Sequence, residues 1–321
     1  MVGLILLLQT LTVAVSGPAT SSEYLPLRVA EAEGHFSREG LAVTLKTTRA
    51  EVGAAEALTQ GQVDLAATSL ESVLRFSLRV PGQRPRLVLG LTAAPPVALL
   101  VAASLGGTVR GIDNLVGLRV GVVAPGAPEQ AWLNGLLTRA RVRPAQIDLV
   151  SLGSRGLVAA VESGDVQAGL VHEPFVTQLV DGGRVTILAD LRTPEAVKRA
   201  LRVATVNAAV FARIDRQPNQ RVLTAFARAV LAAERQLATA NPDDLAGRLS
   251  RSVVGTGEEF ERRVVTTRGS YLADGWVSPD QLRNTVALIR AHQPLPASVK
   301  VPSPDDMLHL APLKRATQAR E

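Results

Sequence analysis

The stretch ALTQGQVDLA, residues 57–66, recurs in pattern as AVESGDVQAG at residues 160–169, an offset of 103 positions. Each stretch is typical of a helix end, a glycine suited to a left-handed cap (Gly61 or Gly164) and a short apolar strand. Gly53 and Gly156 share the same offset and are predicted to open the two helices. The spacing therefore predicts a chain built from two similar halves.

The similarity extends upstream of both stretches. Leu11–Val15 parallels Leu118–Val122 as an apolar strand, and each run is followed by a loop containing glycine and proline. Helices are expected next over 23–34 and 129–141, and then second strands over 42–47 and 147–152. Each half thus follows the order strand–loop–helix–strand–loop–helix–strand. This alternation predicts an α/β fold with mostly parallel sheets flanked by helices.

The chain beyond the second half is mainly helical in pattern. A connecting strand is expected near 202–211, and helices over 218–240, 242–249, 258–274 and 279–291. The last segment, 293–321, is rich in proline and ends in basic residues. It is predicted to be an extended strap or a frayed tail.

Composition excludes several classes of protein. The chain has 35 basic and 29 acidic residues, a net charge of +6 and no cysteine. The absence of cysteine rules out disulfides, thiolate metal sites, a cysteine nucleophile and a lipid-anchored N-terminal cysteine. Most basic residues are arginines scattered singly, which favours a solvated surface over a nucleic-acid interface. No apolar run is long enough for a membrane span.

The first residues have two interpretations. Leu4–Leu8 resembles the apolar core of a secretory signal, and Ala14–Ser16 supplies small residues where a cleavage site would need them. However, no positive charge precedes the apolar run, and Thr10–Ser16 alternates as a β-strand does. We interpret residues 1–9 as the remnant of a signal segment and Thr10 as the start of the mature protein.

A ligand site is expected where strands end, because open α/β sheets bind ligands beyond the carboxyl ends of their strands. Four such segments are Ser16–Tyr24, Thr68–Leu70, Ala124–Gln130 and His172–Pro174. Each leads into a helix, whose free N–H groups can hold a polar group or an anion. The predicted ligand contacts are Ser16, Gly17, Thr20, Ser21, Tyr24, Thr68, Ser69, Gly126, Ala127, Gln130, Glu173 and Asn207.

Several of these residues also have a purely structural interpretation. Thr20 and Ser21 could cap the following helix, and Thr68 with Ser69 fits an N-cap well. Tyr24 could stack on a ligand from an exposed loop or pack in the core. A single histidine such as His172 is more often structural than a metal ligand. Glu173, at a predicted strand end, is expected to face the cleft.

Motifs for catalysis or cofactor binding are missing from the sequence. It has no GxxxxGK[ST] loop, no GxGxxG after a strand, no HExxH and no GxSxG. Its four histidines are widely spread, which gives a catalytic triad little support. We therefore expect a binding protein with no catalytic residue, no metal and no cofactor.

Several motifs, in their order along the chain, resemble those of a known family. Glu23–Ala30 with Glu33–Phe36, the 57–66 stretch, Leu115–Val122 and His172–Pro174 together resemble the SsuA/THI5-like (NMT1-type) periplasmic solute-binding proteins. The likeness covers about residues 10–290.

The resemblance implies a type II periplasmic binding protein fold. Lobe one would combine residues 10–98 with 205–292, and lobe two would be 99–204. Hinge strands would lie at 99–103 and 204–207, and 293–321 would be a tail. The protein would be a monomeric, periplasmic component of an ABC importer that passes a small molecule to a permease and its ATPase. An enzyme of THI5-like or lyase type on the same fold is the alternative.

The ligand class is left open by the resemblance. Family members imply a sulfonate, taurine or nitrate, but residues 125–128 read Pro-Gly-Ala-Pro and offer few side-chain donors. Glu173 would repel an anion unless it is protonated or paired with an arginine. These residues therefore slightly favour a ligand with a donor or cationic group, such as an amine or a pyrimidine-like heterocycle, and a sulfonate, taurine or nitrate is the alternative.

Overall fold

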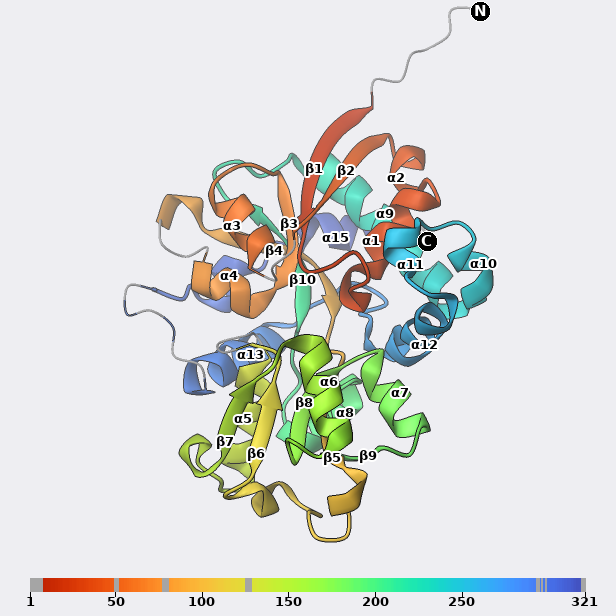
Figure 1. The fold of residues 1–321 in the computed structure, drawn as a ribbon. Helices are drawn as coiled ribbons and strands as arrows, with labels where there is room; N and C mark the ends of the chain where they lie inside the picture. Colours follow the sequence, from red (N-terminus) through yellow and green to blue (C-terminus); the bar gives the residue numbers. More distant parts are fainter. Residues whose placement is uncertain are drawn as a thin grey trace, which may run out of the picture.

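The chain forms two lobes, each built on one sheet (Figure 1). The computed structural model describes residues 8–48, 52–76, 81–124, 129–292, 295, 297 and 299–318. Within these, the first sheet holds, in spatial order, β2 (Leu41–Thr47), β1 (Gln9–Val15), β3 (Leu65–Ser69), β10 (Ala208–Arg213) and β4 (Pro85–Thr92). The second holds β7 (Asp148–Ser151), β6 (Arg119–Val122), β8 (Ala168–His172), β5 (Val97–Ala102) and β9 (Val185–Asp190). The α/β prediction is confirmed, with one topology used twice.

Strand directions are the same in both sheets. β1 pairs in parallel with β2 and β3, whereas β10 is antiparallel to β3 and β4. Likewise β6 is parallel to β7 and β8, and β5 is antiparallel to β8 and β9. The parallel part therefore covers three strands of each sheet. The strand that enters from the other lobe, β10 or β5, reverses direction.

Helices flank both sheets. Those packed around the first are α1 (Leu25–Ala32), α2 (His35–Arg38), α3 (Gly53–Thr59), α4 (Leu70–Phe76), α9 (Gln220–Thr239), α10 (Pro242–Ala246), α11 (Arg251–Val254), α12 (Gly257–Thr267), α14 (Pro304–Met307) and α15 (Ala311–Gln318). Helix α13 (Pro279–His292) packs against α4 of lobe one and α5 of lobe two. Around the second are α5 (Gln130–Arg139), α6 (Gly153–Ser163), α7 (Phe175–Asp181) and α8 (Pro194–Leu201). Short 3₁₀ turns are η1 (Ser22–Tyr24), η2 (Pro81–Gln83), η3 (Ala103–Leu105), η4 (Ile112–Leu115), η5 (Pro144–Gln146) and η6 (Arg268–Ser270).

The alternation of β5 explains how lobe two is packed. Leu99 and Val101 belong to a core cluster with residues of α5, while Ala98 and Leu100 belong to another with residues of α6 and α7. Successive side chains of a strand point to opposite faces, so both faces of this sheet are covered.

None of the helices in the described ranges is long and apolar enough to cross a bilayer.

The repeated glycines largely behave as predicted. Gly61 and Gly164 adopt left-handed φ values of 70° and 82° directly after α3 and α6. Gly53 opens α3, but Gly156 lies inside α6, which begins at Gly153. The helix ends are therefore equivalent, and the helix starts are not.

The C-terminal segment differs from the prediction of a frayed tail. Residues 299–318 pack against lobe one, where the amide of His309 donates to the carbonyl of Leu87 at 2.8 Å. Leu313 of α15 is fully buried, and Leu310 and Ala316 join the same core. Leu310 directly precedes α15, and Leu313 and Ala316 are three residues apart on one face of the helix, which explains its docking.

The chain crosses between the lobes twice. The first crossing is 93–96, between β4 and β5, so residues 99–102 lie inside β5 rather than in the hinge that the sequence predicted. The second crossing includes 204–207, as expected. Thr205 links the crossings, because its Oγ1 donates to the carbonyl of Ala93 at 2.8 Å. The amide of Val206 donates to Thr285 Oγ1 of α13 at 3.0 Å, so α13 holds the second crossing.

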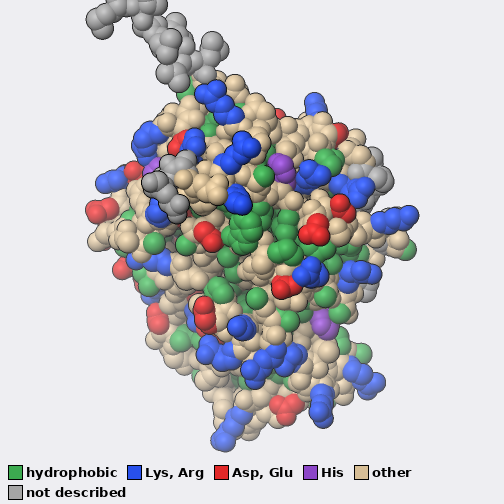
Figure 2. All heavy atoms as spheres, turned by 180° about the vertical axis from the view of Figure 1, so that it is seen from behind, with side chains coloured by type: hydrophobic (Ala, Val, Ile, Leu, Met, Phe, Trp, Pro, Cys, Tyr) green, Lys and Arg blue, Asp and Glu red, His purple; other side chains and the backbone are tan. Residues whose placement is uncertain are grey.

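On the face shown in Figure 2, basic side chains are spread over the surface, with acidic ones between them. Several form ion pairs, including Arg228 with Glu39 at 2.7 Å and Arg248 with Glu33 at 3.3 Å. This arrangement agrees with the solvated surface that the scattered arginines indicated.

We expect Gly169→Ala to destabilise the protein by about 1–3 kcal/mol, because overpacking a core strains its neighbours. A Cβ at Gly169 would lie 2.6 Å from Val161 and 2.9 Å from Leu157, both on α6. Denaturant unfolding measures the effect. Gly107→Ala is the matched control, since no atom lies within 4 Å of its added Cβ. Equal stabilities of the two variants would contradict the prediction.

Candidate functional site

Ionisable side chains from both lobes meet between them. Glu23 comes from η1 of lobe one, while Glu129, directly before α5, and His172, at the end of β8, come from lobe two. Nε2 of His172 lies 3.4 Å from Oε1 of Glu129. The Glu23 carboxylate interacts electrostatically with both of these residues and accepts a hydrogen bond from Asn207. The cluster therefore exists only when the two lobes are together.

The pKa values of the two glutamates move in opposite directions. Burial raises the pKa of Glu23, although His172 partly offsets this shift. Burial would also raise the pKa of Glu129, but the hydrogen bond and charge of His172 hold it below the usual range. Glu129 is therefore the ionised partner of His172, and Glu23 is the carboxyl group that protonates more easily.

A small cavity adjoins this cluster at the junction of the lobes. It has a volume of about 10 Å³, room for roughly one water molecule. Its lining combines the end of β3 with α4, α5, α13 and the second crossing: Ser69, Leu70, Glu71, Trp132, Val206, Asn207, Thr285 and Ile289. Asn207 joins the cavity to the cluster, because it also hydrogen-bonds to Glu23.

Glu71 is the polar group of this cavity whose hydrogen bonding is incomplete. Its Oε1 accepts from Nε of Arg75 at 2.6 Å, but its buried Oε2 has no hydrogen-bond partner. Burial raises the pKa of Glu71, Arg75 lowers it, and the nearby charge of Glu129 raises it further. A buried acceptor without a partner is costly, so this oxygen is available to a donor from a ligand.

Among the predicted contacts, Ser69 and Asn207 lie in the cavity wall. Ser69 also caps α4, since its Oγ accepts from the amide of Ser72 at 3.2 Å. The capping interpretation is therefore correct for Ser69, and it is compatible with a place in the cavity wall.

Ser16, Gly17 and Thr68 form a buried support at the strand ends. Ser16 and Thr68 are fully buried, and Ser16 Oγ donates to Thr68 Oγ1 at 2.8 Å. Gly17 has a left-handed φ of 69°, which lets the chain turn away from β1. These residues join β1 to β3, and their role as ligand contacts stays a prediction.

The expected exposed position of Tyr24 is wrong. Tyr24 is 2% exposed and belongs to the core of lobe one. Ser21 precedes η1 but makes no side-chain capping bond, and the carbonyl of Thr20 accepts a hydrogen bond from Arg263. Thr20 and Ser21 remain partly exposed.

Glu173 is paired with an arginine, one of the two conditions under which it would not repel an anion. Arg192 Nη1 lies 2.5 Å from Glu173 Oε1, and the glutamate side chain is fully buried. Thr177 donates to both carboxylate oxygens, from its amide at 3.1 Å and its hydroxyl at 2.9 Å. Its placement favours a role in supporting β8 and α7 over contact with a ligand.

The other predicted loop is only partly visible. Gly126 and Ala127 lie outside the described residues. Gln130 is the first residue of α5 and is half-buried.

Sequence reasoning missed Glu23, Glu71, Glu129 and Trp132 as site residues. One signal was present: each of the three glutamates lies at the start of a helix that follows a strand end. Acidic residues at a helix start usually interact favourably with the helix dipole. This pattern therefore does not distinguish a ligand-binding glutamate from one that only stabilises the helix end. Within the described ranges, no group of three His, Asp or Glu residues could hold a metal ion.

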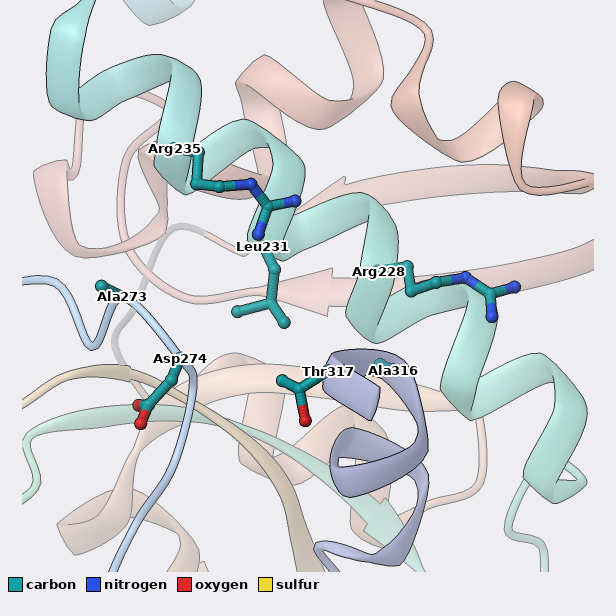
Figure 3. A pocket seen from close by; sticks show the side chains of 7 residues that line it. All are labelled: Arg228, Leu231, Arg235, Ala273, Asp274, Ala316 and Thr317. Carbon is teal, nitrogen blue, oxygen red and sulfur yellow. The ribbon is translucent and has the colours of Figure 1, made fainter. Parts of the chain in front are cut away.

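A larger cavity of about 220 Å³ lies elsewhere, in lobe one (Figure 3). Leu231 and Arg235 line it from α9, Thr317 lines it from α15, and Asp274 comes from the loop after η6. Its described lining belongs to a single lobe. It is therefore not the site that the two lobes build together.

Comparisons with known proteins agree with the two-lobed fold. The NMT1/THI5-like family matches residues 21–246. The taurine-binding periplasmic protein of Escherichia coli K12 is 25% identical over 70% of this chain, and the match spans only 66% of that protein. A Bordetella bronchiseptica protein structure covers 97% of both chains at 24% identity with a TM-score of 0.77. The aliphatic sulphonate binding protein SsuA of Escherichia coli has a TM-score of 0.71 at 16% identity, over 91% of this chain and 95% of its own.

Proposed function

The chain belongs to the NMT1/THI5-like family, and we propose that it is the solute-binding component of an ABC importer. It captures a small polar molecule between its lobes and delivers it to a membrane permease. The observation that carries this proposal is the polar cluster of Glu23, Glu129 and His172, which both lobes supply and which lies partly buried between them. Two chain crossings connect these lobes, as closure around a ligand requires.

Closure is the proposed mechanism of capture. Lobe one comprises about residues 10–92 with the part after 207, and lobe two about 97–203, with the bending at 93–96 and 204–207. Opening separates Glu23 from His172 and Glu129, which exposes their polar groups to solvent. A ligand that bridges the lobes replaces this lost solvation and favours the closed state.

The proposed partners are a permease and its ATPase, with the protein working in the periplasm. The name of the taurine-binding periplasmic relative supports this location. In proteoliposomes that contain the importer, the ligand-loaded protein stimulates ATP hydrolysis, and the ligand-free protein stimulates it less.

Ligand screening tests the binding function directly. We expect at least one compound among sulfonates, nitrate, pyrimidines, amines and amino acids to raise the melting temperature. A ligand at 100 times its Kd adds about 2.7 kcal/mol of stability. Trp132, 5% exposed in the cavity wall, should report the same binding by fluorescence.

The fluorescence measurement needs one substitution. The chain has two tryptophans, and Trp276 is 44% exposed, so Trp276→Phe leaves Trp132 as the sole reporter. The variant should bind as the unmodified protein does, with a change in emission that saturates with ligand. A full screen without any stabilising compound would refute the solute-binding proposal.

An enzyme on the same fold is the second candidate. The Glu129–His172 pair supports it, because a carboxylate beside a histidine is an arrangement that general bases use. NMR of any bound ligand, incubated with catalytic amounts of protein, separates the two functions. An unchanged ligand supports a receptor, and turnover supports the enzyme.

A further inference from the structure

We propose that the cleft recognises a primary ammonium group and so selects a small amine over a sulfonate or nitrate anion of similar size. This inference rests on the proposed solute-binding function and names the ligand class of that site. It differs from the anionic ligands named for the sulphonate-binding relative.

The unpartnered oxygen of Glu71 is the first reason. Oε2 of Glu71 is buried without a hydrogen-bond partner, and the residue, 4% exposed, lines the interlobe cavity. In its ionised form, which a bound cation stabilises, this carboxyl group accepts hydrogen bonds and does not donate them. An ammonium group has three donors and no acceptor. A sulfonate or nitrate offers this oxygen only acceptors.

The size and composition of the cavity are the second reason. About 10 Å³ accommodates one water-sized group, and an ammonium head group has this size. Trp132 and the polar residues Ser69 and Asn207 line the same space. An indole ring attracts cations, so Trp132 would favour the same charge that Glu71 favours.

The balance of charges is the third reason. Glu23 and Glu71 both interact with Glu129, so three carboxyl groups share the junction of the lobes. The cations beside them each face one of these carboxyl groups: Nε of Arg75 pairs with Glu71, although its buried Nη2 has no hydrogen-bond partner, and His172 pairs with Glu129. A bound cation would relieve the repulsion among the carboxylates, whereas a bound anion would increase it.

Matched ligands of opposite charge test the proposal. Titration calorimetry with n-butylamine, butane-1-sulfonate and nitrate compares an ammonium with two anions, and the two organic probes share one carbon chain. We expect butylamine to bind at least 10-fold more tightly than either anion. Glu71→Gln should weaken butylamine binding by at least 10-fold, because charge-assisted hydrogen bonds are stronger than neutral ones.

Two controls identify the cause of any change. Glu39→Gln removes the same charge from lobe one, where Glu39 pairs with Arg228, and should leave butylamine affinity unchanged. Circular dichroism and thermal unfolding show whether the Glu71→Gln protein remains folded. If it does not, Trp132→Leu serves as the second variant, and it should weaken butylamine more than it weakens the anions.

The outcomes separate this inference from the solute-binding proposal. Anions that bind as tightly as butylamine, or a folded Glu71→Gln protein with unchanged amine affinity, would overturn the ammonium site and leave the receptor standing. Failure of every compound in the wider screen would overturn both.

Discussion

Replacing Arg192 with methionine is expected to destabilise the protein by about 3–5 kcal/mol, the range seen when one partner of a buried ion pair is removed. Glu173 has a fully buried side chain, and Arg192 Nη1 lies 2.5 Å from its Oε1. Without the guanidinium, that carboxylate stays buried and loses its counterion. Urea unfolding at neutral pH measures the loss.

A double-mutant comparison assigns this loss to the stranded charge. Arg192→Met combined with Glu173→Gln leaves no buried carboxylate there, so it should be less destabilised than Arg192→Met alone. Arg184→Met is the matched control in the same lobe. Its partner, Glu162, is 3.4 Å away and Arg184 is 62% exposed, so its loss should cost no more than about 1 kcal/mol. A double variant as unstable as the single one would show that the lost bonds of Arg192 to Asp190 or its lost packing, and not the stranded charge of Glu173, are responsible.

The contacts of Glu173 also show where prediction from sequence stops. Local rules were sufficient for its place at a strand end, since His172 closes β8 and Pro174 precedes α7. The partner, Arg192, is 19 residues further on, beyond an intervening helix and strand. The chain has 31 arginines, and tertiary packing decides which of them turns inward to Glu173. No local sequence pattern reveals that choice.

The fold was predictable for a related reason. Glycine caps and strand–helix alternation depend on neighbours within a few residues, and the internal repeat supplied each of them twice. The secondary structure predicted for the first half therefore supported the same prediction for the second half. To place the first hinge from the sequence, one must know where β5 begins. That start is hard to recognise because β5 is buried on both faces. Its uniform apolar run has no periodicity to mark the crossing at 93–96.

The candidate site was predictable only in outline. Ser69, at a predicted strand end, and Asn207, in the second crossing, do line the cavity, but the cavity is completed by Glu71, Trp132 and α13 from distant parts of the chain. Tyr24 illustrates the opposite error, because a loop position near a cleft does not reveal which way a side chain turns.

The second large effect is expected at Glu234, where Glu234→Gln should stabilise the protein at alkaline pH and change little near pH 5. Glu234 lies in α9, is 3% exposed, and neither of its carboxylate oxygens has a hydrogen-bond partner. Burial raises its pKa well above 4.5, and the charge of Asp274 raises it further, against a smaller opposing effect of Arg235. The folded protein therefore binds a proton here at pH values where the unfolded chain has released it.

The sign of the pH dependence follows from that difference in bound protons. The stability contributed by protonated Glu234 is fully present below the unfolded pKa of 4.5 and is lost as pH rises through the folded pKa. Over that window the free energy of unfolding falls by about 1.4 kcal/mol per pH unit for one such group. Glutamine cannot release a proton, so the variant should lack this decline, whereas Glu261→Gln, at an exposed position of α12, should keep it. Urea unfolding from pH 5 to pH 9 compares the three proteins. If the free energy of unfolding varies with pH in the same way for the Glu234 variant and the unmodified protein, the Glu234 carboxylate does not titrate in this range. Because Glu23 and Glu71 also have raised pKa values and act in the same direction, only the difference between the curves belongs to Glu234.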